Sequence, residues 1–93
     1  PKDEIVFCEI IDRKIYLNLA SGEVLDYYER IEHLETKLND HFFRCHRSYL
    51  INMRHLKSYK NGTAYMDNGR EVPVSRLRGK DFSSAVLQYM ENM

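Results

Sequence analysis

Tryptophan is absent from this sequence of 93 residues, and only two prolines and two cysteines occur. The cysteines, Cys8 and Cys45, stand far apart and do not suggest a disulfide framework, so both thiols are expected to be reduced. No apolar run approaches the roughly 20 residues that span a bilayer, and no signal-peptide pattern opens the chain. These absences predict a cytoplasmic protein without a membrane partner.

The composition is nonetheless that of a folded protein. Hydrophobic residues make up 43% of the chain, with seven tyrosines and four phenylalanines, a content that disordered segments lack. A chain of this length supports one modest core, so residues 1–93 are expected to form a single domain. Because the chain opens at Pro1 without a methionine, we expect it to be a domain of a longer protein.

Charge is balanced overall but unevenly distributed along the chain. The formal net charge is zero, which by itself argues against a nonspecific nucleic-acid binder. Residues 1–40 carry five Lys/Arg and ten Asp/Glu, whereas residues 41–80 carry nine Lys/Arg and two Asp/Glu. Such a local surplus of cations is typical of a surface that binds a polyanion, and the acidic part would face away from it.

Sequence periodicity predicts a mainly β fold with two helices, a minor α+β class built from small antiparallel sheets. Runs rich in β-branched and aromatic residues predict strands at residues 5–11, 15–19, 24–27, 42–45, 56–59, 63–66 and 71–74, while residues 49–53 carry mixed helix and strand signals. Apolar residues at helical spacing predict an interior helix over residues 28–38 and a C-terminal helix over residues 76–91, with Ser75 as the cap of the second helix.

Two Asn-Gly dipeptides mark tight turns in the second half of the chain. Asn61-Gly62 and Asn68-Gly69 predict type I′ hairpin turns, because both central residues of that turn need a positive φ. The three strands that they join are expected to form an antiparallel meander. Pro73 cannot donate a hydrogen bond to a neighbouring strand, so the last strand is expected to lie at a sheet edge or to end there.

The most informative segment is residues 42–53, where two arginines, a histidine and a serine interrupt an apolar sequence. Arg47 has the planar fork that pairs with guanine O6 and N7, and His46 and Ser48 suit phosphate oxygens. The structural alternative is a solvated strand end whose arginines, Arg44 and Arg47, pair with the acidic first part of the chain. Composition alone favours neither interpretation.

Further cations stand at predicted turns and helix starts. Arg76, Arg78 and Lys80 follow a strand at a helix start, where backbone N–H groups also favour an anion. Three cations oppose the helix dipole there unless an anionic partner is supplied, which favours a binding role. Arg13 and Lys14 lie in a turn between two strands, where a long cation reaches outward, although a lysine in a turn is usually only solubilising.

Other chemistries find little support in the residues. Cys45, His46 and His55 have neither the C-x-x-C nor the paired-histidine spacing of a metal site. His46 and Ser48 lack an orienting acid, and no glycine-rich phosphate loop or nucleophile elbow occurs, so neither an enzyme nor a cofactor is expected. Cys45 lies between two cationic residues, which allows a lowered thiol pKa with redox sensitivity, but a buried packing role is the commoner one.

Two motifs resemble those of a known family. Phe-Phe-Arg-Cys-His-Arg-Ser-Tyr-Leu-Ile-Asn at residues 42–52 and Val-Pro-Val-Ser-Arg at residues 72–76 resemble the LytTR family of DNA-binding domains, which are output domains of bacterial response regulators. The resemblance extends to the strand at residues 7–9 and the helix ending at Leu38, and so covers nearly the whole chain. It implies a β-rich fold without a recognition helix, in which loops from strand junctions enter successive DNA grooves, usually at direct repeats and often as a dimer.

The resemblance also implies site residues. Arg47 and Arg76 match positions that contact DNA in the family, and Arg76 is the better candidate for a major-groove base. The turn with Arg13 and Lys14 matches a third contact, also to bases. The residues expected to contact phosphates are His46, Ser48, Ser75, Arg78 and Lys80. Cys45 matches a redox-sensing cysteine of a relative, but the second motif holds no cysteine to partner it.

The resulting hypothesis is sequence-specific binding of duplex DNA, at direct repeats in promoter regions, by the C-terminal part of a bacterial transcriptional regulator. Its partners would be an N-terminal receiver or sensing domain and a second copy of the domain on DNA. One alternative is a protein-interaction module whose basic face docks an acidic partner, without preference among DNA sequences. The other is a single-stranded nucleic-acid binder that stacks bases on Tyr49, Tyr59 and Tyr65 and prefers unpaired strands.

Overall fold

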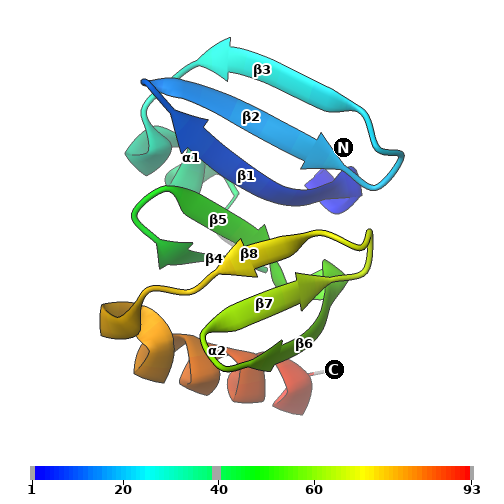
Figure 1. Ribbon diagram of the computed structural model, residues 1–93, viewed down its shortest axis with the longest axis vertical. Coiled ribbons are helices and arrows are strands. Elements are labelled where there is room, and N and C mark those ends of the chain that lie inside the picture. The colour runs from blue at the N-terminus through cyan, green and yellow to red at the C-terminus, as the bar shows by residue number, and fades with distance from the viewer. Residues whose placement is uncertain (1, 39–40, 93) are drawn as a thin grey trace.

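The computed structural model of the protein describes residues 2–38 and 41–92, and within them eight strands form two antiparallel sheets (Figure 1). The strands are β1 (Ile5–Ile11), β2 (Lys14–Leu19), β3 (Val24–Tyr28), β4 (Phe42–His46), β5 (Tyr49–Asn52), β6 (Leu56–Lys60), β7 (Thr63–Met66) and β8 (Glu71–Pro73). The helices are α1 (Ile31–Lys37) and α2 (Gly79–Glu91), and the 3-10 turns are η1 (Lys2–Glu4), η2 (Met53–His55) and η3 (Arg76–Arg78).

The larger sheet has the strand order β3-β2-β1-β5-β4. Its middle strand, β1, pairs with β2 on one side and with β5 on the other, so that Cys8 lies between Leu17 and Leu50. Successive residues of a strand point to opposite faces of a sheet. Leu50 and Ile51 accordingly belong to different cores, one on each face of the sheet.

The smaller sheet confirms the predicted meander, with the order β6-β7-β8. Asn61 and Gly62 both have a positive φ, of 53° and 77°, as the type I′ prediction requires. The second turn differs, because only Gly69 has a positive φ, and Asn68 instead accepts a hydrogen bond from the Arg70 N–H through its side chain. Pro73 lies in β8 at the edge of this sheet, as expected.

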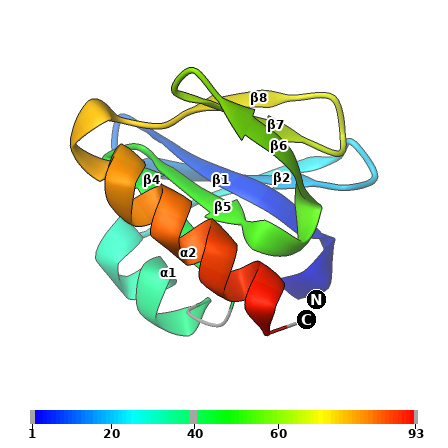
Figure 2. The ribbon, with the colours of Figure 1, turned by 90° about the horizontal axis from the view of Figure 1, so that it is seen from below.

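Each helix closes one core against the strands. Leu34 and Leu38 pack with Ile5, Ile15 and Leu50 on one face of the larger sheet. Phe82 of α2 is fully buried in the other core, which joins the two sheets and contains Val6, Phe7, Ile51, Ala64, Met66 and Val72. In Figure 2 both helices lie below the strands. The mainly β fold with two helices is therefore confirmed.

Both helices begin later than the sequence predicts. α1 starts at Ile31 and not at residue 28, because Tyr27 and Tyr28 pair with Ile15 and Lys14 and so extend β3. The predicted helix over residues 76–91 is divided into η3 and α2. Ser75 precedes η3 with an extended backbone, and its side chain makes no capping hydrogen bond. The expectation of Ser75 as a helix cap is thus wrong, since the long helix starts only at Gly79.

Candidate nucleic-acid interface

Three loops lie along one side of the molecule, at the left in Figures 1 and 2. They are the β1–β2 turn, the β4–β5 turn and η3. Backbone hydrogen bonds hold them together, since the Ile10 N–H donates to the Ser48 carbonyl and the Ser75 N–H donates to the Cys45 carbonyl, each at 2.9 Å. We call residues 12–13, 46–48 and 75–78 the loop edge.

The β1–β2 turn holds two residues in the left-handed region without a glycine. Asp12 and Arg13 have φ values of 50° and 71°, a conformation that costs a residue with a side chain roughly 1–2 kcal/mol. This pair forms the whole turn, and Lys14, expected in the turn, is instead the first residue of β2. Arg13 is exposed at the tip of the turn.

Lys14 is engaged within the protein. Its Nζ lies 2.8 Å from Asp26 Oδ2 and 5.3 Å from the centre of the Tyr28 ring. The hydrogen bond to Asp26, together with its charge, raises the pKa of Lys14 and lowers the pKa of Asp26. Both partners of this ion pair are partly exposed, so the pairing contributes little to stability. Of the two cations predicted here, Arg13 has the more available charge.

The β4–β5 turn presents Arg47 between His46 and Ser48. The Ser48 N–H donates to His46 Nδ1 at 3.1 Å, so the neutral imidazole carries its hydrogen on Nε2. That arrangement leaves Nε2–H as a donor. The Arg47 side chain is exposed and forms no ion pair with any residue that the structure describes.

Arg44, three residues earlier, has the opposite environment. Its side chain is only 17% exposed and lies 3.5 Å from Glu32 and 3.8 Å from Glu35, both on α1. Its Nη2 donates to the Arg47 carbonyl at 2.8 Å. The structural interpretation of the basic cluster therefore holds for Arg44, which ties α1 to the turn, while Arg47 stays free for a ligand.

The third segment, η3, carries Arg76, Leu77 and Arg78. Arg76 and Leu77 are exposed, whereas Arg78 Nη1 donates to the Arg44 carbonyl at 3.0 Å and fixes η3 against β4. Lys80 is exposed one residue into α2. Sequence reasoning did not single out Leu77. No local pattern marked it, because its exposure depends on the division of the predicted helix into η3 and α2.

Cys45 is a packing residue and not an activated thiol. Burial raises its pKa to about 12, and its Sγ–H donates to the Pro73 carbonyl at 3.5 Å. Burial likewise raises the pKa of Cys8 to about 12. Because the thiolate is the reactive form, the lowered pKa considered for Cys45 is wrong, and the packing interpretation is confirmed.

Two of the three tyrosines that were considered for base stacking make contacts within the protein. The Tyr49 hydroxyl donates to Glu9 Oε2 at 2.7 Å, and its ring lies 6.2 Å from that of Phe7. The Tyr59 ring meets Phe82 edge-on at 4.8 Å. Tyr65 is half-buried. These contacts offer no open aromatic platform at Tyr49 and Tyr59, which disfavours the single-strand alternative.

On the opposite side of the molecule, Arg54 and His55 are both paired with aspartates. Arg54 Nη1 lies 2.6 Å from Asp3 Oδ1. His55 Nδ1 lies 2.9 Å from Asp67 Oδ2, and its Nε2 lies 2.6 Å from the Asp3 carbonyl. We call Asp3, Arg54, His55 and Asp67 the clasp edge. Burial lowers the pKa of His55, but the hydrogen bonds to Asp3 and Asp67 outweigh it, so the pKa lies above the ordinary value.

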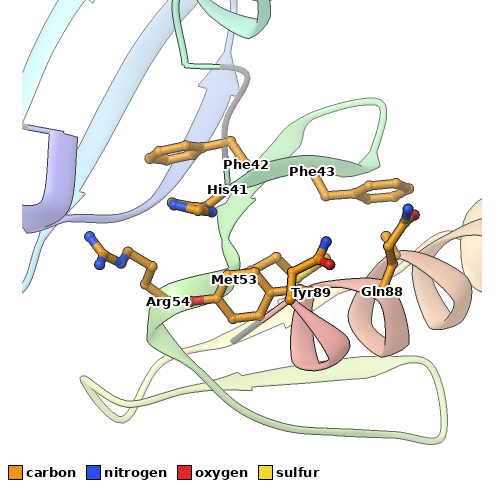
Figure 3. A pocket seen from close by; sticks show the side chains of 9 residues that line it. His41, Phe42, Phe43, Met53, Arg54, Gln88 and Tyr89 are labelled. Carbon is orange, nitrogen blue, oxygen red and sulfur yellow. The ribbon is translucent and has the colours of Figure 1, made fainter.

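A hollow of about 570 Å³ lies between β4, η2 and α2, and Figure 3 shows His41 and Phe43 facing it from one side and Tyr89 from the other. Arg54 of the clasp edge also lines it. None of its lining residues belongs to the loop edge. In the described part of the chain, no three His, Cys, Asp or Glu residues come together as metal ligands, and no helix is long and apolar enough to cross a membrane.

Comparisons with known proteins identify the family to which the chain is similar. The family model of the LytTr DNA-binding domain matches residues 1–86. The transcriptional regulatory protein YpdB of Escherichia coli K12 is 33% identical over 97 residues, which cover 87% of this chain and 39% of YpdB, and YpdB of Shigella flexneri matches equally. The chain thus spans about two fifths of the length of these curated relatives.

A solved structure is similar over most of the chain. It is the LytTr DNA-binding domain of a methyl-accepting/DNA response regulator from Bacillus cereus, with a TM-score of 0.82 and 30% identity. The likeness covers 92% of this chain and 84% of that one. Sequence and fold therefore point to the same family.

Proposed function

Because this chain belongs to the LytTr DNA-binding domain family, we propose that it binds duplex DNA sequence-specifically through the loop edge. It acts as the output domain of a bacterial transcriptional regulator of the response-regulator type, in the cytoplasm and without catalytic activity. An N-terminal receiver or sensing domain precedes it in the whole protein. The targets are direct repeats in promoter regions, where a second copy of the domain binds alongside.

One observation supports this proposal above the others. Arg47 and Arg76 come from different strand junctions, yet both lie exposed on the same edge, and neither is paired with a carboxylate of the described residues. Exposed guanidinium groups without a carboxylate partner are available to pair bidentately with guanine in the major groove. We assign base contacts to Arg47, Arg76 and Arg13, with Lys14 as the weakest base contact because Asp26 engages it.

Phosphate contacts complete the interface. His46 offers its Nε2–H, and the other proposed contacts are Ser48, Ser75 and Arg78 of the loop edge and Lys80 at the start of α2. Such contacts fix the register on the duplex without reading sequence. If about six phosphates are neutralised, the affinity should fall by roughly 10³ between 50 and 200 mM salt.

The test is selection from a random duplex library, followed by footprinting and by affinity measurements on the selected site. Arg76→Ala should cost about 1–3 kcal/mol of binding and relax the preference at one base position. Lys80→Ala is the matched comparison, since it should weaken all sequences alike and reduce the salt slope by about one. Arg76→Ala binding the selected site as tightly as the unchanged protein contradicts the assignment. Enrichment of no sequence favours the protein-interaction alternative.

A further inference from the structure

Leu77 is the most exposed of the large hydrophobic residues in the described part of the chain, at 95%. A single exposed leucine is common on protein surfaces and needs no explanation by itself. Here the position matters, because Leu77 stands at the centre of η3 between Arg76 and Arg78. It belongs to neither hydrophobic core and packs against neither.

The exposure of Leu77 does not result from a loose segment. The Ser75 N–H donates to the Cys45 carbonyl at 2.9 Å, and the Arg78 N–H donates to the Ser75 carbonyl at 3.0 Å. The Arg78 guanidinium holds the Arg44 carbonyl at 3.0 Å. η3 is thus attached on both sides of Leu77, so its side chain is presented outward from a fixed backbone.

The surroundings of Leu77 restrict what can cover it. The neighbouring side chains are cations, which suit a polyanion and not an apolar protein surface. The other exposed aliphatic residues are Ile11 at the end of β1, Val24 and Leu25 on β3, and Leu87 on α2. Within the DNA major groove, the apolar group that is presented next to the hydrogen-bonding edges of the bases is the thymine 5-methyl.

We propose that Leu77 packs on the 5-methyl group of a thymine next to the base that Arg76 reads. This inference rests on the proposed duplex binding and adds a specificity-determining residue to it. The contact makes the domain prefer T over C at that position by apolar contact, without a hydrogen bond.

The experiment removes the methyl group and the leucine separately and together. Each thymine of the selected duplex is replaced in turn by deoxyuridine, and dissociation constants are measured for the unchanged domain and for Leu77→Ala. At one position, deoxyuridine should weaken binding of the unchanged domain about three- to fivefold, the range expected for one buried methyl group. Leu77→Ala should lose most of that sensitivity at the same position only.

Leu87→Ala is the matched control, since Leu87 is an exposed leucine on α2, away from the loop edge. It should keep the full deoxyuridine effect. Equal sensitivity of Leu77→Ala and the unchanged domain at every thymine overturns the inference, as does a selected site without thymine beside the Arg76 position. If either result is found while the domain still binds the selected site specifically, only the Leu77 inference fails and the proposed function is unaffected. If the domain prefers no duplex sequence at all, the proposed function and the Leu77 inference both fail.

Discussion

The loop edge and the clasp edge contain the same kinds of residue in opposite electrostatic states. At the clasp edge, Arg54 and His55 are each held by an aspartate, Asp3 or Asp67. At the loop edge, Arg47 and Arg76 find no carboxylate among the described residues. The comparison teaches that the presence of cations does not mark a binding surface by itself. Pairing separates Arg54 and His55 from Arg47 and Arg76, and an unpaired cation keeps its charge available for a ligand.

The strongest way to break this comparison is to remove two cations from the loop edge and, separately, two cations from outside it. Arg47→Ala with Arg76→Ala should weaken binding to the selected duplex by at least about 2 kcal/mol, since each base-reading guanidinium contributes about 1–3 kcal/mol. Arg54→Ala with Lys57→Ala removes the same charge from the clasp edge and from exposed Lys57 of β6, both outside the loop edge, and should change the affinity far less. Fluorescence anisotropy at constant salt measures both. Equal losses for the two pairs would mean that net charge alone drives binding.

A second change sharpens the contrast between Arg44 and Arg47. Arg44→Ala should lower the free energy of unfolding by about 1–3 kcal/mol, because it deletes the bond to the Arg47 carbonyl and frees α1 from the turn. Arg47→Ala should leave stability within about 0.5 kcal/mol, as for other exposed side chains. Urea denaturation followed by circular dichroism compares the two variants. Equal stability of both variants contradicts the structural role of Arg44.

The strained β1–β2 turn allows stability and binding to be separated. Arg13→Gly should raise the free energy of unfolding by about 0.5–1 kcal/mol, because glycine adopts a positive φ without the steric penalty but loses more chain entropy. The same variant should bind the duplex more weakly. Arg13→Lys keeps both the strain and the charge and serves as the control. A glycine variant that binds as tightly as the unchanged domain would remove Arg13 from the interface.

The smallest expected effect is the pH dependence of the clasp edge. His55 donates from both ring nitrogens only when it is protonated, and its pKa in the folded protein lies above the ordinary value of 6.5. Its contribution to stability is therefore complete below the unfolded pKa and is lost as the pH rises through the folded pKa. The melting temperature should fall across that window, and His55→Gln should flatten the fall. His46→Gln, at the loop edge, should retain it.

Much of the fold was predictable because the signals are local. The β-branched runs and the Asn61-Gly62 turn placed most of the strands, since these features act through neighbouring residues. The start of α1 was not predictable, because the pairing of Tyr28 with Lys14 decides whether that residue belongs to a strand or a helix. The β1–β2 turn was predicted with Lys14 in it, and the positive φ of Asp12 and Arg13 was not foreseen, because neither residue is a glycine.

The candidate site was predictable as a set of residues but not as an arrangement. The sequence singles out Arg44 and Arg47 equally, and only the approach of Glu32 and Glu35 on α1 separates their roles. The exposure of Leu77 depends on the division of the predicted helix into η3 and α2, which begins at Gly79 beside the Tyr59 hydroxyl. Both depend on contacts between distant segments, which local patterns do not encode.

The most direct test of the central claim is an NMR titration of the isotopically labelled domain with the selected duplex. The account predicts that the amide signals of all three segments of the loop edge shift together and saturate at one stoichiometry. The amide signals of Arg54, His55 and the α2 residues that line the hollow in Figure 3 should not shift. Shifts that concentrate at the clasp edge or along that hollow, with residues 12–13, 46–48 and 75–78 unchanged, would contradict it.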